Sequence, residues 1–165
     1  MPPRFNILLA EDDAVDVELL TRAFKDAGVP HSFEVAPDGQ AAIDFLREVE
    51  RRPGMTAPAL VLLDMKMPRR NGLEVLQWIR QQDALRCVPV FMFSASALAS
   101  DVEPAYALGA NIYLVKPSST VQRAEIAAFI NDWLTLHQPS LAVTQGPSAA
   151  LRFRADWIKR HGGNN

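Results

Sequence analysis

The chain has 165 residues, of which 48% are hydrophobic, and its formal net charge is -2. This length fits one globular domain with a short extension, while the charge and the absence of a long apolar stretch exclude a basic nucleic-acid surface and a membrane span. The single cysteine, Cys87, excludes an intrachain disulfide, so we expect a cytoplasmic protein that binds neither nucleic acid nor membrane.

Strand-like and helix-like segments alternate five times along the chain. Near-continuous apolar runs indicate strands that are buried on both faces, and apolar residues at helical spacing indicate helices between them. Such alternation predicts right-handed crossovers and an α/β fold, a doubly wound five-stranded parallel sheet with helices on both faces. The expected elements are strand 6–10, helix 15–27, strand 32–36, helix 39–49, strand 59–64, helix 73–81, strand 89–93, helix 99–108, strand 112–115 and helix 120–137.

The end of the chain differs in character from the rest. We expect one domain over residues 1–138 and a C-terminal extension over residues 139–165. Within the extension, Gln145-Gly146-Pro147-Ser148 is typical of a linker, and residues 149–161 can form a short helix with Ser148 as its N-cap. The extension is too short for a DNA-binding or enzyme domain, so we expect a stand-alone domain.

Polar side chains follow four of the apolar strands. Glu11 and Asp12 come after the first strand, Asp64 ends the third, Ser94 follows the fourth and Lys116 follows the fifth. Because ligands of open parallel sheets bind at the carboxyl ends of the strands, we expect these groups to share one pocket. Carboxylates, a hydroxyl and an ammonium suit a hard divalent cation beside a carboxylate that accepts a phosphoryl group.

These residues occur in the order and spacing of a response-regulator receiver domain, which the chain resembles over roughly residues 5–137. The resemblance implies a flavodoxin-like sheet with strand order 2-1-3-4-5 and a phosphorylation-gated switch rather than an enzyme. The motifs that carry it are Glu11-Asp12, Leu63-Asp64-Met65-Lys66-Met67-Pro68, Asn71-Gly72, Ser94-Ala95 and Lys116-Pro117.

The resemblance also implies a role for each pocket residue. Asp64 is expected to accept the phosphoryl group from a sensor histidine kinase. Asp12, Asp64 and the backbone carbonyl of Lys66 are expected to ligate Mg²⁺, with Glu11 holding a coordinated water. Lys116 is expected to pair with Asp64 or with its phosphate.

Two further residues match the switch of such domains. Ser94 matches the hydroxyl that binds the phosphate, and Tyr113 matches its aromatic partner, although Tyr113 also suits an ordinary half-buried strand aromatic. The Lys116–Pro117 peptide is expected to be cis by the same resemblance. Asp13 is better explained as the N-cap of the first helix than as a metal ligand.

A narrower resemblance concerns the small response regulators that are paired with bacterial phytochrome histidine kinases. It lies in the segments 67–76, 105–118 and 132–134 and suggests a bacteriophytochrome as the kinase partner. The chain departs from these relatives at Phe93-Ser94-Ala95-Ser96, where they more often carry two threonines.

The last expected helix has more apolar surface than one core contact needs. Its apolar positions span about half of the helical circumference. In receivers the fourth helix, fifth strand and fifth helix form the usual dimer face, so we expect a homodimer there through Tyr106, Phe129 and Trp133. The alternative is that residues 141–165 fold back over this surface. The apolar positions are 126, 127, 129, 130, 133, 134 and 136.

Two classes of function remain open at this point. The first is the phosphorylation switch. The second is a phosphatase or phosphotransferase that forms an aspartyl phosphate, or a phosphorelay intermediate without its own output. A phosphatase of the haloacid-dehalogenase type needs a second Asp two residues after its nucleophile, where this chain has Lys66.

Overall fold

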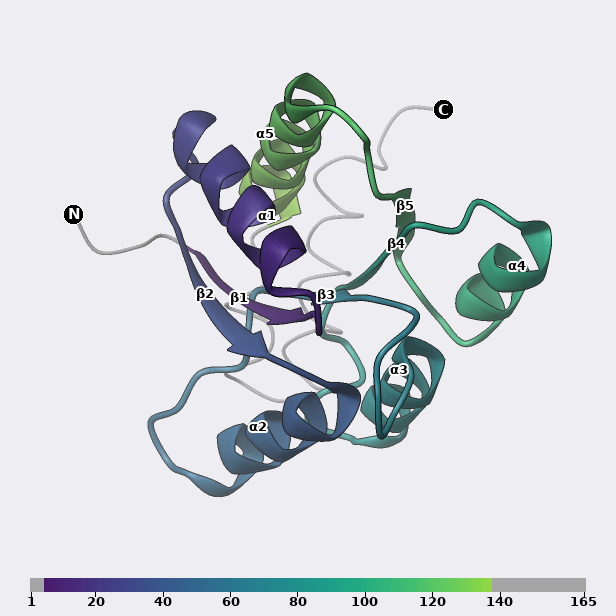
Figure 1. Ribbon diagram of the computed structural model, residues 1–165. Helices are drawn as coiled ribbons and strands as arrows, with labels where there is room; N and C mark the ends of the chain where they lie inside the picture. Colours follow the sequence, from purple (N-terminus) through teal and green to yellow (C-terminus); the bar gives the residue numbers. More distant parts are fainter. Residues whose placement is uncertain (1–4, 138–165) are drawn as a thin grey trace, which may run out of the picture.

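Strands and helices alternate throughout the part of the chain that the computed structural model describes, residues 5–137 (Figure 1). Every element expected from the sequence is present within two residues of its expected bounds. The expected linker and short helix of residues 139–165 lie outside the described residues. The elements are β1 (Phe5–Ala10), α1 (Ala14–Asp26), β2 (His31–Ala36), α2 (Gly39–Arg51), β3 (Leu60–Leu63), α3 (Gly72–Gln81), β4 (Val90–Ser94), α4 (Ala99–Ala107), β5 (Ile112–Val115) and α5 (Thr120–His137).

The five strands form one parallel sheet with the order β2-β1-β3-β4-β5, as expected. The central strand β3 pairs with β1 on one side and with β4 on the other. The chain therefore builds outward in both directions from the β1–β3 pair. In sheets of this kind the crevice at this reversal, at the carboxyl ends of the strands, is where ligands bind.

The helices cover both faces of the sheet, α1 and α5 on one side and α2, α3 and α4 on the other (Figure 1). Successive strand side chains point to opposite faces, so each strand supplies both cores. Ile7 and Leu9 pack in the core with Phe24 of α1, whereas Leu8 and Val61 pack in the core with helices α2 and α3. Burial on both faces explains why the inner strands are almost entirely apolar.

Polar caps fix the loops that lead from the strand ends into the first three helices. Asp13 caps α1, since its Oδ1 accepts a hydrogen bond from the Val15 N–H at 2.8 Å, which confirms its expected role. Asp38 caps α2, and Asn71 starts α3 with a reciprocal capping box. Helix α4 has no side-chain cap and buries only Ala105, so it is the least anchored of these four helices.

One backbone expectation was wrong. No peptide bond among the described residues is cis, so the Lys116–Pro117 bond is trans. The cis expectation came from the family resemblance alone, and the trans form is the lower in energy for an X–Pro bond by about 0.5–1 kcal/mol.

Within residues 5–137, no helix has the length and apolar character that a membrane crossing requires.

Candidate functional site

The fold brings together the polar groups that follow the strands. Glu11 and Asp12 lie just after β1, and Asp64 lies just after the neighbouring strand β3. Ser94 is the last residue of β4, and Lys116 directly follows β5. All five groups therefore lie at the same edge of the sheet, as the sequence predicted.

Three carboxylates form a cluster at this edge. Glu11, Asp12 and Asp64 each place one oxygen within 4.8 Å of the others. Glu11 and Asp64 are buried, whereas Asp12 is exposed. Burial raises the pKa of both Glu11 and Asp64 above the usual carboxyl range, because few solvent molecules stabilise their charged forms. A divalent cation suits such a cluster, because it binds carboxylate oxygens and offsets their negative charge.

The Lys116 ammonium reaches this cluster from the edge strand. Its Nζ lies 2.6 Å from Glu11 and 3.5 Å from Asp64. Burial lowers the pKa of Lys116, but hydrogen bonds to Glu11 and Asp16 and the charge of Asp64 outweigh burial and raise it above its ordinary value. Lys116 is therefore a permanent cation beside Asp64.

The loop after β3 carries the expected backbone ligand, Lys66. A hollow of about 690 Å³ opens beside it, and the exposed Asp12 forms part of its wall. The hollow gives solvent a path to the acid side of the site. The loop is fixed at its far end, because the Gly72 N–H donates to the Met65 carbonyl at 3.1 Å and Asn71 caps α3.

Both expected switch residues form a hydrogen bond with Ser96. Ser94 is buried, and its Oγ accepts from the Ser96 N–H at 3.2 Å. The Tyr113 hydroxyl donates to the Ser96 carbonyl at 3.0 Å. The backbone N–H of Tyr113 donates to the Tyr106 hydroxyl at 3.1 Å, which ties β5 to α4. No sequence pattern predicts this bond between the two tyrosines.

Sequence reasoning also missed two acids that position the site. Asp16, in the first turn of α1, accepts from Lys116 Nζ at 2.9 Å. The position of Asp16, in the first helical turn after the acid pair, is the feature of the sequence that could have pointed to this contact. Asp38 pairs with Arg69, a residue with a positive φ of 63° in the loop after β3, and this pair lowers the pKa of Asp38. No sequence pattern links those two residues.

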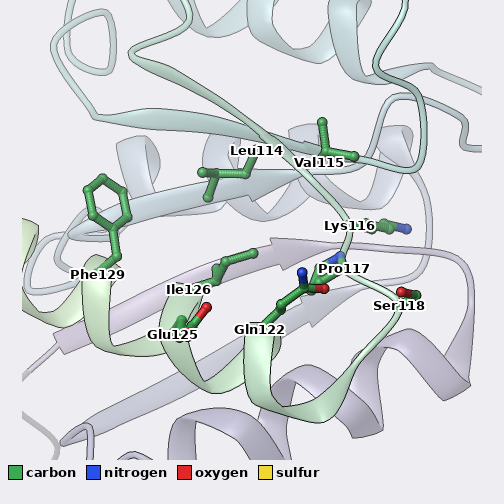
Figure 2. A pocket seen from close by; sticks show the side chains of 9 residues that line it. All are labelled: Leu114, Val115, Lys116, Pro117, Ser118, Gln122, Glu125, Ile126 and Phe129. Atoms are coloured by element: carbon green, nitrogen blue, oxygen red, sulfur yellow. The ribbon is translucent and has the colours of Figure 1, made fainter.

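A groove lies between β5 and α5, on the surface where the sequence predicted a dimer face. It has a volume of about 640 Å³, and Leu114, Ile126 and Phe129 supply apolar walls (Figure 2). Phe129 and Tyr106 are 44% and 49% exposed. Trp133 is half-buried, and its ring packs edge-on against Phe91 at 4.9 Å.

The chain is similar to known response regulators. Residues 7–130 match the family model of the response regulator receiver domain. The probable methanogenesis regulatory protein FilR2 of Methanothrix harundinacea is 39% identical over 115 residues, which are 70% of this chain and 74% of that protein. Response regulator Rcp1 of Synechocystis sp. is 36% identical over 115 residues, 70% of this chain and 78% of Rcp1.

Solved structures give the same result. The phosphorylated cyanobacterial phytochrome response regulator RcpA superposes with a TM-score of 0.71 at 31% identity, covering 78% of this chain and 92% of RcpA. The Mn²⁺-bound form of Rcp1 superposes with a TM-score of 0.68 at 34% identity, covering 79% of this chain and 94% of Rcp1.

Proposed function

The chain belongs to the response regulator receiver domain family, and from this membership we propose that Asp64 accepts a phosphoryl group from a sensor histidine kinase. One observation carries the proposal. A buried carboxylate at the end of the central strand lies in one cluster with two further acids and 3.5 Å from a lysine ammonium. Phosphoryl transfer depends mainly on such positioning and on neutralising charge.

The proposed transfer is a displacement at phosphorus. A carboxylate oxygen of Asp64 forms a P–O bond while the P–N bond of the phosphohistidine breaks. The electron pair of that bond stays on the imidazole nitrogen, which then takes up a proton. Lys116 stabilises the charge that gathers on the transferred oxygens, because its ammonium is held beside Asp64.

We propose Mg²⁺ as the metal of this site. Asp12, Asp64 and the backbone carbonyl of Lys66 would hold it, and Glu11 would hold one of its waters. The carboxylate cluster supports this set, because Mg²⁺ prefers oxygen ligands and keeps several waters. When bound, the cation supplies the second positive charge that brings an anionic phosphoryl donor to an anionic acceptor. The Mn²⁺-bound structure of Rcp1 is consistent with a divalent cation here.

The proposed switch runs from Ser94 to helix α4. The Ser94 hydroxyl would turn from Ser96 toward a phosphoryl oxygen on Asp64. Ser96 also holds the Tyr113 hydroxyl, so a shift of this loop changes the contact of Tyr113. Tyr113 is in turn bonded to Tyr106 of α4, the least anchored of the first four helices. Phosphorylation would therefore change the conformation of the surface formed by α4 and β5.

The proposed partners are a kinase of the bacterial phytochrome type and a second copy of the chain. The similarity to RcpA and Rcp1 supports the first. The groove beside Phe129 and the exposed rings of Phe129 and Tyr106 support a homodimer through α4, β5 and α5, since large apolar groups gain free energy when they leave water. Trp133 contributes less than expected because Phe91 already covers part of it.

Stoichiometry separates the switch from its alternative, an enzyme that forms an aspartyl phosphate and hydrolyses it repeatedly. The purified chain is mixed with Mg²⁺ and radiolabelled acetyl phosphate, and protein-bound label and free phosphate are followed together. A switch takes up at most one phosphoryl group per chain and releases phosphate slowly. Rapid release of many phosphates per chain, or hydrolysis of unrelated phosphate esters, would favour the enzyme.

A further inference from the structure

The Lys116 ammonium is shared among three carboxylates, and its two closest partners are not Asp64. Nζ donates hydrogen bonds to Glu11 at 2.6 Å and to Asp16 at 2.9 Å. The Asp64 carboxylate lies farther away, at 3.5 Å. In Figure 2 the Lys116 side chain extends away from Phe129 and Ile126. Lys116 thus binds mainly the β1–α1 side of the site and makes only a long ion pair with the expected phosphoacceptor.

Asp16 differs from the other two acids around Lys116. Glu11 and Asp64 belong to the carboxylate cluster that suits a cation, but Asp16 does not. Among residues 5–137, Lys116 is the one hydrogen-bond partner of the Asp16 side chain. The Asp16 side chain is 28% exposed, whereas Lys116 is 12% exposed, so their contact is only partly open to solvent. Its effect on the site therefore passes through Lys116.

We propose that Asp16 is a positioning residue that holds Lys116 toward α1 and so competes with a phosphoryl group on Asp64 for the ammonium. This inference rests on the proposed role of Asp64. A phosphoryl group adds anionic oxygens next to Asp64, and Lys116 must turn toward them to bind. The contact with Asp16 stabilises the unphosphorylated chain more than the phosphorylated one, and only such a difference shifts the equilibrium between them.

The substitution Asp16→Asn tests the competition, because it removes the charge and keeps the size. Beryllofluoride in Mg²⁺ serves as the phosphoryl mimic, and its affinity is measured by calorimetry. We expect Asp16→Asn to raise the affinity roughly twofold to fivefold, because it removes the charge from one ion pair that is partly open to solvent. Glu18→Gln removes a charge from the same helix at an exposed position and is expected to leave the affinity unchanged.

A second comparison separates positioning of Lys116 from simple charge repulsion. In a Lys116→Met background, Asp16→Asn is expected to have no effect on beryllofluoride affinity, since its partner is gone. An effect that persists there would overturn the inference, as would an unchanged or lower affinity of Asp16→Asn in the original background. Thermal unfolding of each variant checks that the fold is retained.

A third measurement does not depend on phosphoryl chemistry. The ¹⁵Nζ resonance of Lys116 in the metal-free chain is expected to shift on Asp16→Asn and to stay in place on Glu18→Gln. A resonance that does not move would show that the contact is absent and would overturn the inference by itself. If the resonance moves but the original chain binds no beryllofluoride, the proposed function of Asp64 fails, and the competition fails with it.

Discussion

The backbone oxygen of Asp64 lies against Gly72, so closely that a Cβ built on the glycine would be 2.2 Å from it. Neither the oxygen nor the start of α3 can move without shifting the loop between them. We expect Gly72→Ala to lower the free energy of unfolding by about 1–3 kcal/mol, as overpacking does, and to weaken Mg²⁺ binding. Urea unfolding and Mg²⁺ titration measure the two effects.

Gly54→Ala is the matched control for this prediction. Gly54 has a φ of +93°, so an alanine there is also strained, but nothing lies within 4 Å of the added Cβ. It is expected to lower stability and to leave Mg²⁺ affinity unchanged. If Gly72→Ala binds Mg²⁺ as tightly as the original chain, the contact with Asp64 does not shape the metal site.

The two adjacent acids after β1 are expected to respond differently to substitution. Asp12→Ala removes a member of the carboxylate cluster and is expected to lower Mg²⁺ affinity strongly. Asp13→Ala removes the α1 cap instead, with an expected loss of about 1 kcal/mol of stability and little change in affinity. Fluorescence or NMR titration measures the affinity of both variants. Equal losses of affinity would mean that the metal ligands are misplaced by one residue.

Stabilisation by Mg²⁺ is expected to fall as the pH falls. The folded pKa values of Glu11 and Asp64 are raised by burial, so the metal-free folded chain takes up protons at a higher pH than the unfolded chain does. Protonation of these two groups therefore makes the metal-free fold more stable as the pH falls from neutral toward the usual carboxyl range of about 4. This contribution to the free energy of unfolding is lost as the pH rises. Mg²⁺ requires the deprotonated acids, so it competes with those protons.

Thermal unfolding in Mg²⁺ and in chelator, from pH 8 down to pH about 5, measures this difference. The gain in Tm from Mg²⁺ is expected to be largest at the alkaline end and to shrink steadily toward the acidic end. A gain that grows on acidification would contradict the assignment of Glu11 and Asp64 to the metal site.

Two aromatic residues of α5 are expected to have different roles, Phe129 in the dimer face and Trp133 in the core. Phe129 is exposed beside the groove and its ring centre lies 6.5 Å from that of Phe91, whereas Trp133 packs edge-on against Phe91 at 4.9 Å. Phe129→Ala is expected to weaken self-association with little loss of monomer stability, and Trp133→Ala is expected to lower the stability of the monomer itself. Val35→Ala, at an exposed position on β2 at the opposite edge of the sheet, is the control. Analytical ultracentrifugation with and without beryllofluoride measures association. A chain that is monomeric in both conditions would contradict the dimer.

The order of the elements and the edge that holds the site were predictable from local pattern. The apolar strands are buried on both faces, which leaves a plain signal in the sequence, and the polar residue after each strand marks the ligand edge. The cap at Asp13 was predictable for the same reason, since its hydrogen bonds reach only to nearby residues. The receiver resemblance supplied the strand order, which periodicity alone does not give.

The unpredicted contacts join residues that are far apart in the chain. Lys116 binds Asp16 across a separation of 100 residues, and Arg69 binds Asp38 across 31. Which acid a lysine reaches depends on side-chain geometry in the folded state. The partial burial of Trp133 was not predictable either, because the apolar positions of a helix do not show how far one ring turns toward the core.

The identity of the phosphoacceptor is the central claim, and labelling of Asp64→Asn tests it most directly. The original chain, Asp64→Asn and Asp13→Asn are each incubated with Mg²⁺ and a radiolabelled phosphoryl donor, either acetyl phosphate or a phosphorylated histidine kinase. We predict stoichiometric, acid-stable and alkali-labile label on the original chain and on Asp13→Asn, and none on Asp64→Asn. Stoichiometric label that persists on Asp64→Asn would contradict the account.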